Sequence, residues 1–123
     1  MKPEAVPEAL IARQVEPFNG GPRLDRLTRR FVTPTDHFFV RTHGTVPTVD
    51  PDAYRLVVEG DVERPLVLSL DELRLRFHPA STTATLQCAG NRRAELLKVA
   101  PLPGEVPWGA EAIGNAEMGG ANS

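Results

Sequence analysis

Short stretches of alternating hydrophobic and polar residues run along this chain, and they predict a protein built mainly from short strands. Residues 38–43 (Phe-Phe-Val-Arg-Thr-His) are one such stretch. A strand there would place Phe39, Arg41 and His43 on one face, because successive side chains of a strand point to opposite sides. One face of this strand would be apolar enough to pack, while the other would present a cation and an imidazole.

Two further strands and a helix are predicted in the middle of the chain. Residues 54–59 (Tyr-Arg-Leu-Val-Val-Glu) alternate in the same way, and residues 66–68 form a short extended run. Ser69 then provides an N-cap, and Glu72 three residues later completes a capping box. The helix that begins here should be brief, because Pro79 disfavours helical backbone in the residue before it.

The threonine-rich residues 81–87 are predicted to form a strand that delivers Cys88 to its C-terminal end. Residues 89–91 contain a glycine and predict a turn. Residues 95–99 fit either a helix or a strand weakly. Beyond Ala100 the prolines and glycines predict a loop.

The N-terminal part of the chain gives weaker signals. Residues 7–15 are predicted to form a short helix with a proline in its first turn, and the turn cluster at residues 19–22 would end it. Residues 23–30 carry four arginines without a clear hydrophobic period, so no element is predicted for them. Together the expected elements indicate a mixed α+β domain of short strands.

The composition is that of a soluble globular protein with one domain. The chain has 123 residues, of which 41% are hydrophobic and 24% charged. A formal net charge of −2 gives no support to a nucleic-acid partner or an anionic membrane partner. No apolar run approaches the roughly 18 residues of a membrane span, and the acidic N-terminus does not resemble a secretory leader. A single cysteine excludes an internal disulfide, so we expect a cytoplasmic protein.

Cys88 is the strongest candidate for chemistry. It follows a predicted strand and precedes a glycine turn, with Arg92 and Arg93 close behind, where positive charge would favour a thiolate. A lone cysteine is most often a small buried hydrophobe. Zinc is a poor fit, because the three histidines show no ligand spacing. A cysteine nucleophile would need a base, for which His43 is the best candidate, so buried hydrophobe, soft metal ligand and nucleophile all remain open.

The other candidate residues each have a structural alternative. Arg41 and His43 could simply belong to an exposed polar strand face. Trp108, the only tryptophan, lies among prolines and could cap a small core or line a pocket. Arg92 and Arg93 could be a solvated surface pair, because adjacent side chains point in different directions. None of these residues is decisive alone.

Four segments gain meaning from their order and separation. They are Phe38-Phe39-Val40-Arg41-Thr42-His43 with Val46-Pro47, then Thr85-Leu86-Gln87-Cys88-Ala89-Gly90-Asn91-Arg92-Arg93, then Pro107-Trp108-Gly109, and last Ala112-Ile113-Gly114-Asn115-Ala116. Together they resemble the molybdopterin-binding domain of the sulfite oxidase family over about residues 16–120. The cysteine segment is long, which makes the resemblance specific.

This resemblance implies a molybdenum-molybdopterin cofactor, with the Cys88 thiolate as the protein's ligand to the metal beside the dithiolene sulfurs of the pterin. It implies a cofactor-binding segment that consists of Phe39, Val40, Arg41, Thr42 and His43. Arg41 would also hold a substrate oxyanion, and Arg93 and Trp108 would complete the anion pocket. The implied reaction is the oxidation of sulfite to sulfate at this centre.

The resemblance also implies how the chain is organised and what it works with. Residues 1–15 would be an N-terminal extension and residues 16–123 a partial molybdopterin-binding domain, so we expect an N-terminal fragment that is inactive alone. Electrons would pass to a separate acceptor, and the full-length protein could be a homodimer. Reduction of nitrate or of methionine sulfoxide in proteins is the alternative activity. A non-catalytic remnant is the alternative to an enzyme.

Overall fold

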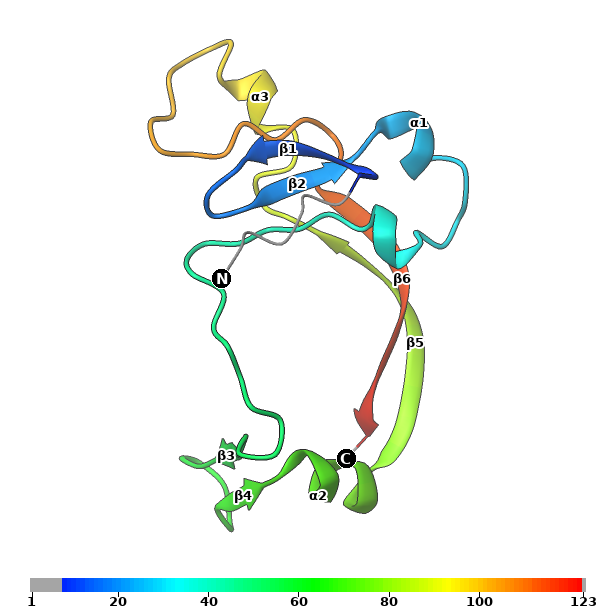
Figure 1. Cartoon of the computed structure of the whole chain (residues 1–123), viewed down its shortest axis with the longest axis vertical. Coiled ribbons are helices and arrows are strands. Elements are labelled where there is room, and N and C mark those ends of the chain that lie inside the picture. The colour runs from blue at the N-terminus through cyan, green and yellow to red at the C-terminus, as the bar shows by residue number, and fades with distance from the viewer. Residues whose placement is uncertain (1–7, 123) are drawn as a thin grey trace. The chain divides into compact units, whose positions relative to one another are not determined.

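The computed structural model describes residues 8–122 of the chain. In chain order, their elements are β1 (Leu10–Gln14), β2 (Asn19–Pro22), α1 (Leu24–Leu27), the 3-10 helix η1 (Thr35–His37), β3 (Leu56–Val58), β4 (Leu66–Leu68), α2 (Leu70–Arg76), β5 (His78–Gln87), α3 (Arg93–Leu96) and β6 (Ile113–Asn122) (Figure 1). The mixture of short helices and short strands agrees with the sequence prediction.

The chain divides into two compact units. Of the described residues, the first unit contains residues 8–45 and 83–117, and the second contains residues 46–82 and 118–122. The described strands form three sheets of two strands each, β1 with β2, β3 with β4 and β5 with β6. No helix within residues 8–122 is long and apolar enough to cross a membrane.

An antiparallel hairpin of β1 and β2 occupies the N-terminal part of the first unit, where Leu10 lies opposite Pro22. The predicted helix over residues 7–15 is therefore wrong for the described residues, and residue 7 lies outside them. Pairing with β2 outweighs the local preference of this segment for a helix. Gly20 of β2 has no room for a side chain, because a Cβ atom would lie 2.8 Å from the carbonyl oxygen of Ile11.

The predicted strand over residues 38–43 is also wrong in most of its length. Only Val40 pairs in a ladder, through main-chain hydrogen bonds of 2.8 and 3.1 Å with Gly20. At Thr42 the segment is held by the Asn19 side chain, which accepts the main-chain N–H at 2.8 Å and donates to the carbonyl at 3.0 Å. Alternation of apolar and polar residues indicated a strand here, but it could not show that the Asn19 side chain takes the place of a neighbouring strand.

The core of the first unit is small and lies next to Cys88. Val106, Trp108 and Ala112 are buried there, and Phe39 and Cys88 pack against them. The Phe39 ring meets the Trp108 ring edge to face, with centroids 6.2 Å apart. Residues 106–112 are therefore a loop that supplies most of a core.

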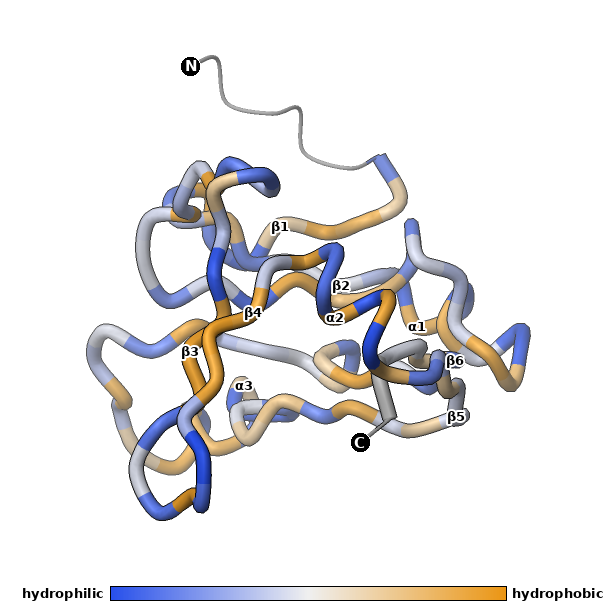
Figure 2. Tube along the Cα trace, turned by 90° about the horizontal axis from the view of Figure 1, so that it is seen from below, coloured by the Kyte–Doolittle hydropathy of each residue, from blue (hydrophilic) through white to orange (hydrophobic). Residues whose placement is uncertain are grey.

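The second unit contains the antiparallel pair of β3 and β4, in which Leu56 lies opposite Leu68. Leu68 is only 2% exposed. Both strands are hydrophobic along their length (Figure 2). The predicted strand at residues 66–68 is confirmed, and the predicted strand at residues 54–59 is confirmed in its central part.

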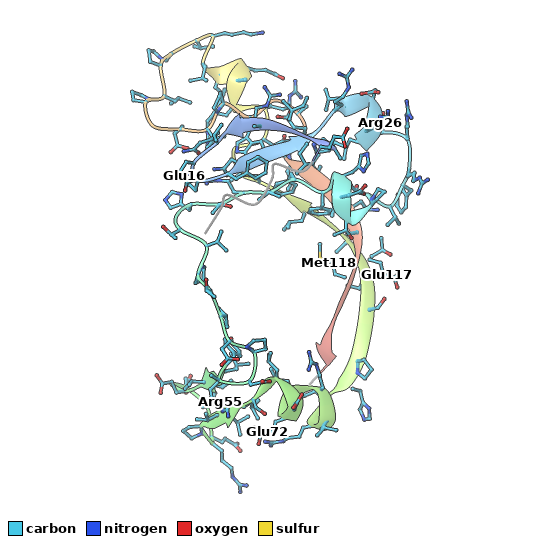
Figure 3. All side chains as sticks on the ribbon, in the orientation of Figure 1. Glu16, Arg26, Arg55, Glu72, Glu117 and Met118 are labelled. Atoms are coloured by element: carbon cyan, nitrogen blue, oxygen red, sulfur yellow. The ribbon has the colours of Figure 1, made fainter. Side chains whose placement is uncertain are left out.

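Helix α2 begins as the sequence predicts. The hydroxyl of Ser69 accepts the main-chain N–H of Glu72 at 3.1 Å, and the Glu72 carboxylate accepts the main-chain N–H of Ser69 at 2.8 Å. These hydrogen bonds lower the pKa of Glu72 below its ordinary value. The helix ends at Arg76, before Pro79. Figure 3 places the Glu72 side chain beside the start of this helix.

Strands β5 and β6 are the longest in the described part of the chain. β5 confirms the predicted strand at residues 81–87 and begins three residues earlier, at His78. β6 is a correction, because a loop was predicted beyond Ala100. Glycine and asparagine are poor strand formers. Gly114, Gly119 and Gly120 lower the strand propensity of this segment, so its sequence did not predict a strand. Pairing with β5 supplies the stability that the sequence of β6 lacks.

Candidate active site

Cys88 stands at the first position after β5, half-buried against the core of the first unit. Its main-chain N–H donates to the carbonyl of Ala112 at 2.9 Å, and its carbonyl accepts the N–H of Asn91 at 2.9 Å. Its sulfur accepts the N–H of Gly90 at 3.4 Å. The end of β5 and the following turn therefore fix the position of the sulfur.

The turn after Cys88 is joined by several hydrogen bonds to the loop that carries Trp108. The Asn91 side chain accepts the N–H of Ala112 at 3.1 Å. The N–H of Arg92 donates to Gly109, and the N–H of Ala94 donates to Trp108 at 2.8 Å. Nothing in the sequence indicated that these two segments bind each other, because they are far apart in the chain and neither forms a strand. The sulfur and the indole are thus positioned by one hydrogen-bonded block.

Arg92 and Arg93 point in different directions, so only one of them belongs to this block. Arg92 is exposed and has a left-handed backbone (φ 66°), and it binds Glu95 through two hydrogen bonds of 2.8 Å. Arg93 is 19% exposed and folds back over the turn, where a Cβ on Gly90 would lie 2.7 Å from its guanidinium. The surface-pair interpretation therefore describes Arg92 and not Arg93.

The Arg93 guanidinium already has partners in the first unit. It donates to the carbonyl of Val106 at 3.2 Å and pairs with Glu105 at 2.7 Å. Glu105 is about half exposed, so the pair remains accessible to solvent. An anion that binds Arg93 from the Cys88 side would share the guanidinium with this carboxylate.

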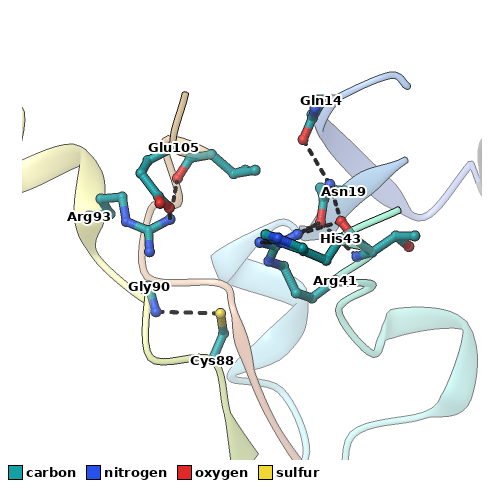
Figure 4. A network of polar contacts seen from close by, with 10 residues as sticks. Gln14, Asn19, Arg41, His43, Cys88, Gly90, Arg93 and Glu105 are labelled. Atoms are coloured by element: carbon teal, nitrogen blue, oxygen red, sulfur yellow. Dashed lines mark hydrogen bonds and ion pairs between the residues drawn. The ribbon is translucent and has the colours of Figure 1, made fainter. Parts of the chain in front are cut away.

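Arg41 and His43 lie together in the structure, as predicted, although no strand holds them. A guanidinium N–H of Arg41 donates to His43 Nδ1 at 2.9 Å. Arginine can only donate, so His43 Nδ1 is the acceptor and its proton lies on Nε2. Arg41 also donates to the carbonyl of Thr42 and to the side chain of Asn19. Figure 4 shows Cys88, in this view, between Arg93 on one side and the Arg41–His43 pair on the other.

Asn19 organises this group and was missed at the sequence level, where it counted only as part of a turn. It is completely buried. Its amide NH₂ donates to Gln14, Pro17 and Thr42 at 2.8 to 3.1 Å. Its carbonyl oxygen accepts the main-chain N–H of Thr42 at 2.8 Å and the Arg41 guanidinium at 3.3 Å. An asparagine beside two glycines is an ordinary turn signal, so nothing in the sequence marked it as buried.

The structure brings together Phe39, Cys88 and Trp108 in one packed group. Val40 is the exposed residue that bridges to Gly20, and it contributes through its main chain. Among the described residues, no hydrogen bond joins His43 to the Cys88 sulfur. The geometry thus gives no support to a cysteine nucleophile with His43 as its base.

The residues around Cys88 fit a molybdenum-molybdopterin group. Within the described part of the chain, the Cys88 sulfur accepts one hydrogen bond, from the Gly90 N–H at 3.4 Å, so it keeps lone pairs for a soft metal. The Trp108 Nε1–H is buried and has no hydrogen-bond partner within the described part of the chain, which marks an open donor. The guanidiniums of Arg41 and Arg93 supply positive charge for oxyanions. Within residues 8–122, no three His, Cys, Asp or Glu residues gather as a metal site.

Comparisons with known proteins point to the same chemistry. The family described as oxidoreductase molybdopterin binding domain matches residues 43–123. Sulfite oxidase of Gallus gallus is 51% identical over 107 residues, which are 87% of this chain and 23% of that protein. Nitrate reductase [NADPH] of Emericella nidulans is 38% identical over 114 residues, which are 89% of this chain and 13% of that protein.

A solved structure agrees with these sequence matches. The sulfane dehydrogenase SoxCD from Paracoccus pantotrophus superposes with a TM-score of 0.63 and 30% identity, covering 84% of this chain and 25% of that one. This chain belongs to the family of oxidoreductase molybdopterin-binding domains. The cofactor of this family is molybdenum-molybdopterin. The chain spans about a quarter of the length of the sulfite oxidase and the sulfane dehydrogenase.

Proposed function

We propose that this chain is part of a molybdenum-dependent oxidoreductase that oxidises sulfite to sulfate. One observation carries the proposal: half-buried Cys88 lies at the end of β5, against the buried cluster that contains Trp108, and the Arg93 guanidinium lies over Gly90 in the turn that follows. Identity of 51% to a sulfite oxidase supports sulfite as the substrate. The proposed roles of the site residues follow from this geometry.

Cys88 would hold the molybdenum through its thiolate, and residues 39–43 would face the pterin. The bound cofactor would supply the redox change and the transferred oxygen. Phe39 would offer an apolar surface, and Val40 would hold the segment through its main-chain bonds to β2. Asn19 would fix Thr42 in place. Arg41 occupies Nδ1 of the neighbouring His43, so the Nε2–H of His43 would be available to donate to a polar part of the cofactor.

Arg41, Arg93 and Trp108 would bind and orient the anionic substrate. Sulfite carries negative charge on its oxygens, which planar guanidiniums bind through charge-assisted hydrogen bonds. Arg41 would release one of its main-chain or side-chain acceptors to do so, and Asn19 would keep its side chain close. The open Nε1–H of Trp108 would provide a neutral donor.

The wider assembly is proposed on the same basis. Oxidation of sulfite adds one oxygen atom from water to the sulfur and releases two electrons and two protons. A separate acceptor would take the electrons, and the whole enzyme would act as a homodimer. Residues 16–123 would be a partial molybdopterin-binding domain of the α+β class, and residues 1–15 an extension. β1 lies in that extension, so the extension would contribute a strand to the first unit.

Kinetics of arginine variants test the substrate assignment. The full-length enzyme that contains this chain is purified from cells that make molybdopterin, and its molybdenum content and sulfite-dependent ferricyanide reduction are measured. Arg41→Gln should raise the KM for sulfite by about tenfold, which is the loss of one charge-assisted contact, and leave molybdenum content unchanged. Arg55→Gln is the control, because Arg55 is exposed and bound to main-chain carbonyls in the second unit. Equal KM values in all three proteins would remove Arg41 from the pocket.

Reduction of nitrate is the second candidate, favoured by the 38% identity to a nitrate reductase. The same purified protein, supplied with a reduced dye, decides between the two. Sulfite oxidation without nitrate reduction supports the proposal. If the protein reduces nitrate faster than it oxidises sulfite, nitrate reduction would replace sulfite oxidation as the proposed activity.

A further inference from the structure

Four arginines crowd the short segment that contains α1 and precedes η1. Arg23, Arg26, Arg29 and Arg30 share residues 23–30 with one acidic residue, Asp25, in a chain whose formal net charge is −2. Figure 3 labels Arg26 at α1. None of these arginines touches the Cys88 group, so the proposed function does not use them.

Asp25 is shared among three of these arginines. It lies 3.0 Å from Arg23, 3.7 Å from Arg29 and 4.0 Å from Arg26. The hydrogen bond from Arg23, with the charges of the other two, lowers the pKa of Asp25 below its ordinary value. One carboxylate cannot neutralise three guanidiniums, and no described carboxylate lies within ion-pair distance of Arg30. The segment therefore keeps a net positive charge.

A hollow of about 280 Å³ opens beside this segment. Its lining includes the three arginines Arg26, Arg29 and Arg30, together with Asp36 and His37 of η1. Asp36 brings a negative charge to the wall, where it binds His37 at 2.9 Å. Three guanidiniums still outnumber this carboxylate, so the hollow is suited to an acidic group.

Phe31 follows these arginines and is 83% exposed. Its backbone is nevertheless held firmly by Asn115 of β6. The Asn115 amide donates to the carbonyl of Phe31 at 2.9 Å. Asn115 also exchanges two further hydrogen bonds with buried Thr33, at 2.7 and 3.1 Å. An aromatic ring is thus displayed on a fixed backbone beside exposed arginines.

This combination favours a protein partner over a small anion. Arginine and aromatic residues are enriched in protein–protein interfaces, and a fixed backbone reduces the entropy lost on binding. A small-anion site would need groups that are buried and convergent, whereas the side chains of Arg23, Arg26 and Arg29 are 51% to 70% exposed. Charge complementarity then defines the partner's surface as rich in carboxylates.

We propose that Arg23, Arg26, Arg29, Arg30 and Phe31 form a docking surface for an acidic protein partner, which places carboxylates against the arginines and an apolar side chain against Phe31. We name these five residues the arginine–phenylalanine surface. This inference is independent of the proposed sulfite oxidation, since no residue of the Cys88 group takes part.

Binding of a designed probe to the whole ¹⁵N-labelled chain tests the proposal. The probe is a short peptide of glutamates around one leucine, and amide shifts in NMR spectra map where it binds. The shifts should gather on residues 23–31 and weaken as salt rises from about 50 to 200 mM. The double variant R29E/R30E should weaken binding by at least about tenfold, because two attractive charges become repulsive. Phe31→Ser should weaken it several-fold without changing the salt dependence.

The control variant is R74E/R76E, which reverses two exposed arginines at the end of α2 in the second unit. It should bind the peptide as the unchanged chain does. Equal weakening in both double variants would mean nonspecific attraction and would overturn the proposal. Displacement of the peptide by inorganic phosphate at a matched concentration of charge would also overturn the proposal, because that outcome defines a small-anion site. Concentration-dependent self-association that masks residues 23–31 would assign the surface to a second copy and would also contradict the proposal.

Discussion

The Nε atom of Arg13 donates to the Glu111 carboxylate at 2.5 Å, which joins residues 98 positions apart. Glu111 is 2% exposed and also accepts the N–H of Gly109. The pair therefore ties the β1–β2 hairpin to the loop that carries Trp108. This loop also binds the turn after Cys88. The Arg13–Glu111 pair therefore connects the hairpin, through the loop, to the candidate site.

Removal of the buried carboxylate should destabilise the first unit. Glu111→Ala leaves the Arg13 guanidinium without its partner and opens a cavity, so the free energy of unfolding should fall by about 2–3 kcal/mol. Urea unfolding followed by the fluorescence of Trp108, the only tryptophan, measures the change. Glu95→Ala removes the carboxylate of an exposed pair and should hardly move the midpoint. Equal midpoints for the two variants would mean that the Arg13–Glu111 pair has no structural role.

Gly114 is the glycine of β6 at which the core is least able to accept a side chain. A Cβ atom there would overlap the Phe38 ring, which stacks on Phe39 at 5.4 Å between centroids. Gly114→Ala should lower the free energy of unfolding by about 1–3 kcal/mol through overpacking. Gly44→Ala is the matched control, because nothing lies within 4 Å of its added Cβ. A neutral Gly114→Ala variant would contradict the packing of Phe38 described above.

Asn19 should prove more important than its place in a turn indicates. Asn19→Ala removes five hydrogen bonds and leaves the part-buried main-chain N–H of Thr42 unpaired, so it should destabilise the chain by about 2–3 kcal/mol. Gln14→Ala loses one contact of the same network and should destabilise it less. Amide hydrogen exchange at Thr42 gives a local reading. Unchanged protection of that amide in Asn19→Ala would refute the role of Asn19.

The capping box of α2 predicts a pH dependence with a definite sign. Its hydrogen bonds lower the pKa of Glu72 below the ordinary value of 4.5, so the unfolded chain binds a proton there more readily than the folded chain. The stabilisation from Glu72 is therefore present above pH 4.5 and is lost as pH falls through the lowered pKa. Glu72→Gln should flatten this part of the stability–pH curve. Identical acid branches for both proteins would contradict the prediction.

The elements that were predictable from sequence are those whose signal is local. Ser69 and Glu72 specify the start of α2 by themselves, and the apolar run at residues 66–68 forms a strand as expected. β1 and β6 were not predictable, because each exists through its pairing partner and not through its own propensity. The segment around Val40 failed for a third reason: a buried side chain, Asn19, takes the place of a neighbouring strand.

The sequence named candidate residues for a site, but it did not predict how they are arranged. Phe39 and Cys88, which the resemblance names for the cofactor, pack against the buried cluster that contains Trp108. The engagement of Arg93 by Glu105 was not foreseeable, because the ion pair joins two loops. The roles of the site residues, the cytoplasmic location, the homodimer and the domain boundaries stay predictions.

The central claim is that Cys88 binds molybdenum. X-ray absorption at the molybdenum edge counts sulfur ligands directly, in the full-length enzyme that contains this chain, purified from cells that make molybdopterin. The account predicts that the Cys88→Ser variant shows one sulfur ligand fewer than the unchanged protein and loses sulfite oxidation. Arg92→Gln, the control at an exposed neighbouring position, should keep both the sulfur count and the activity. An unchanged sulfur count in Cys88→Ser would contradict the account.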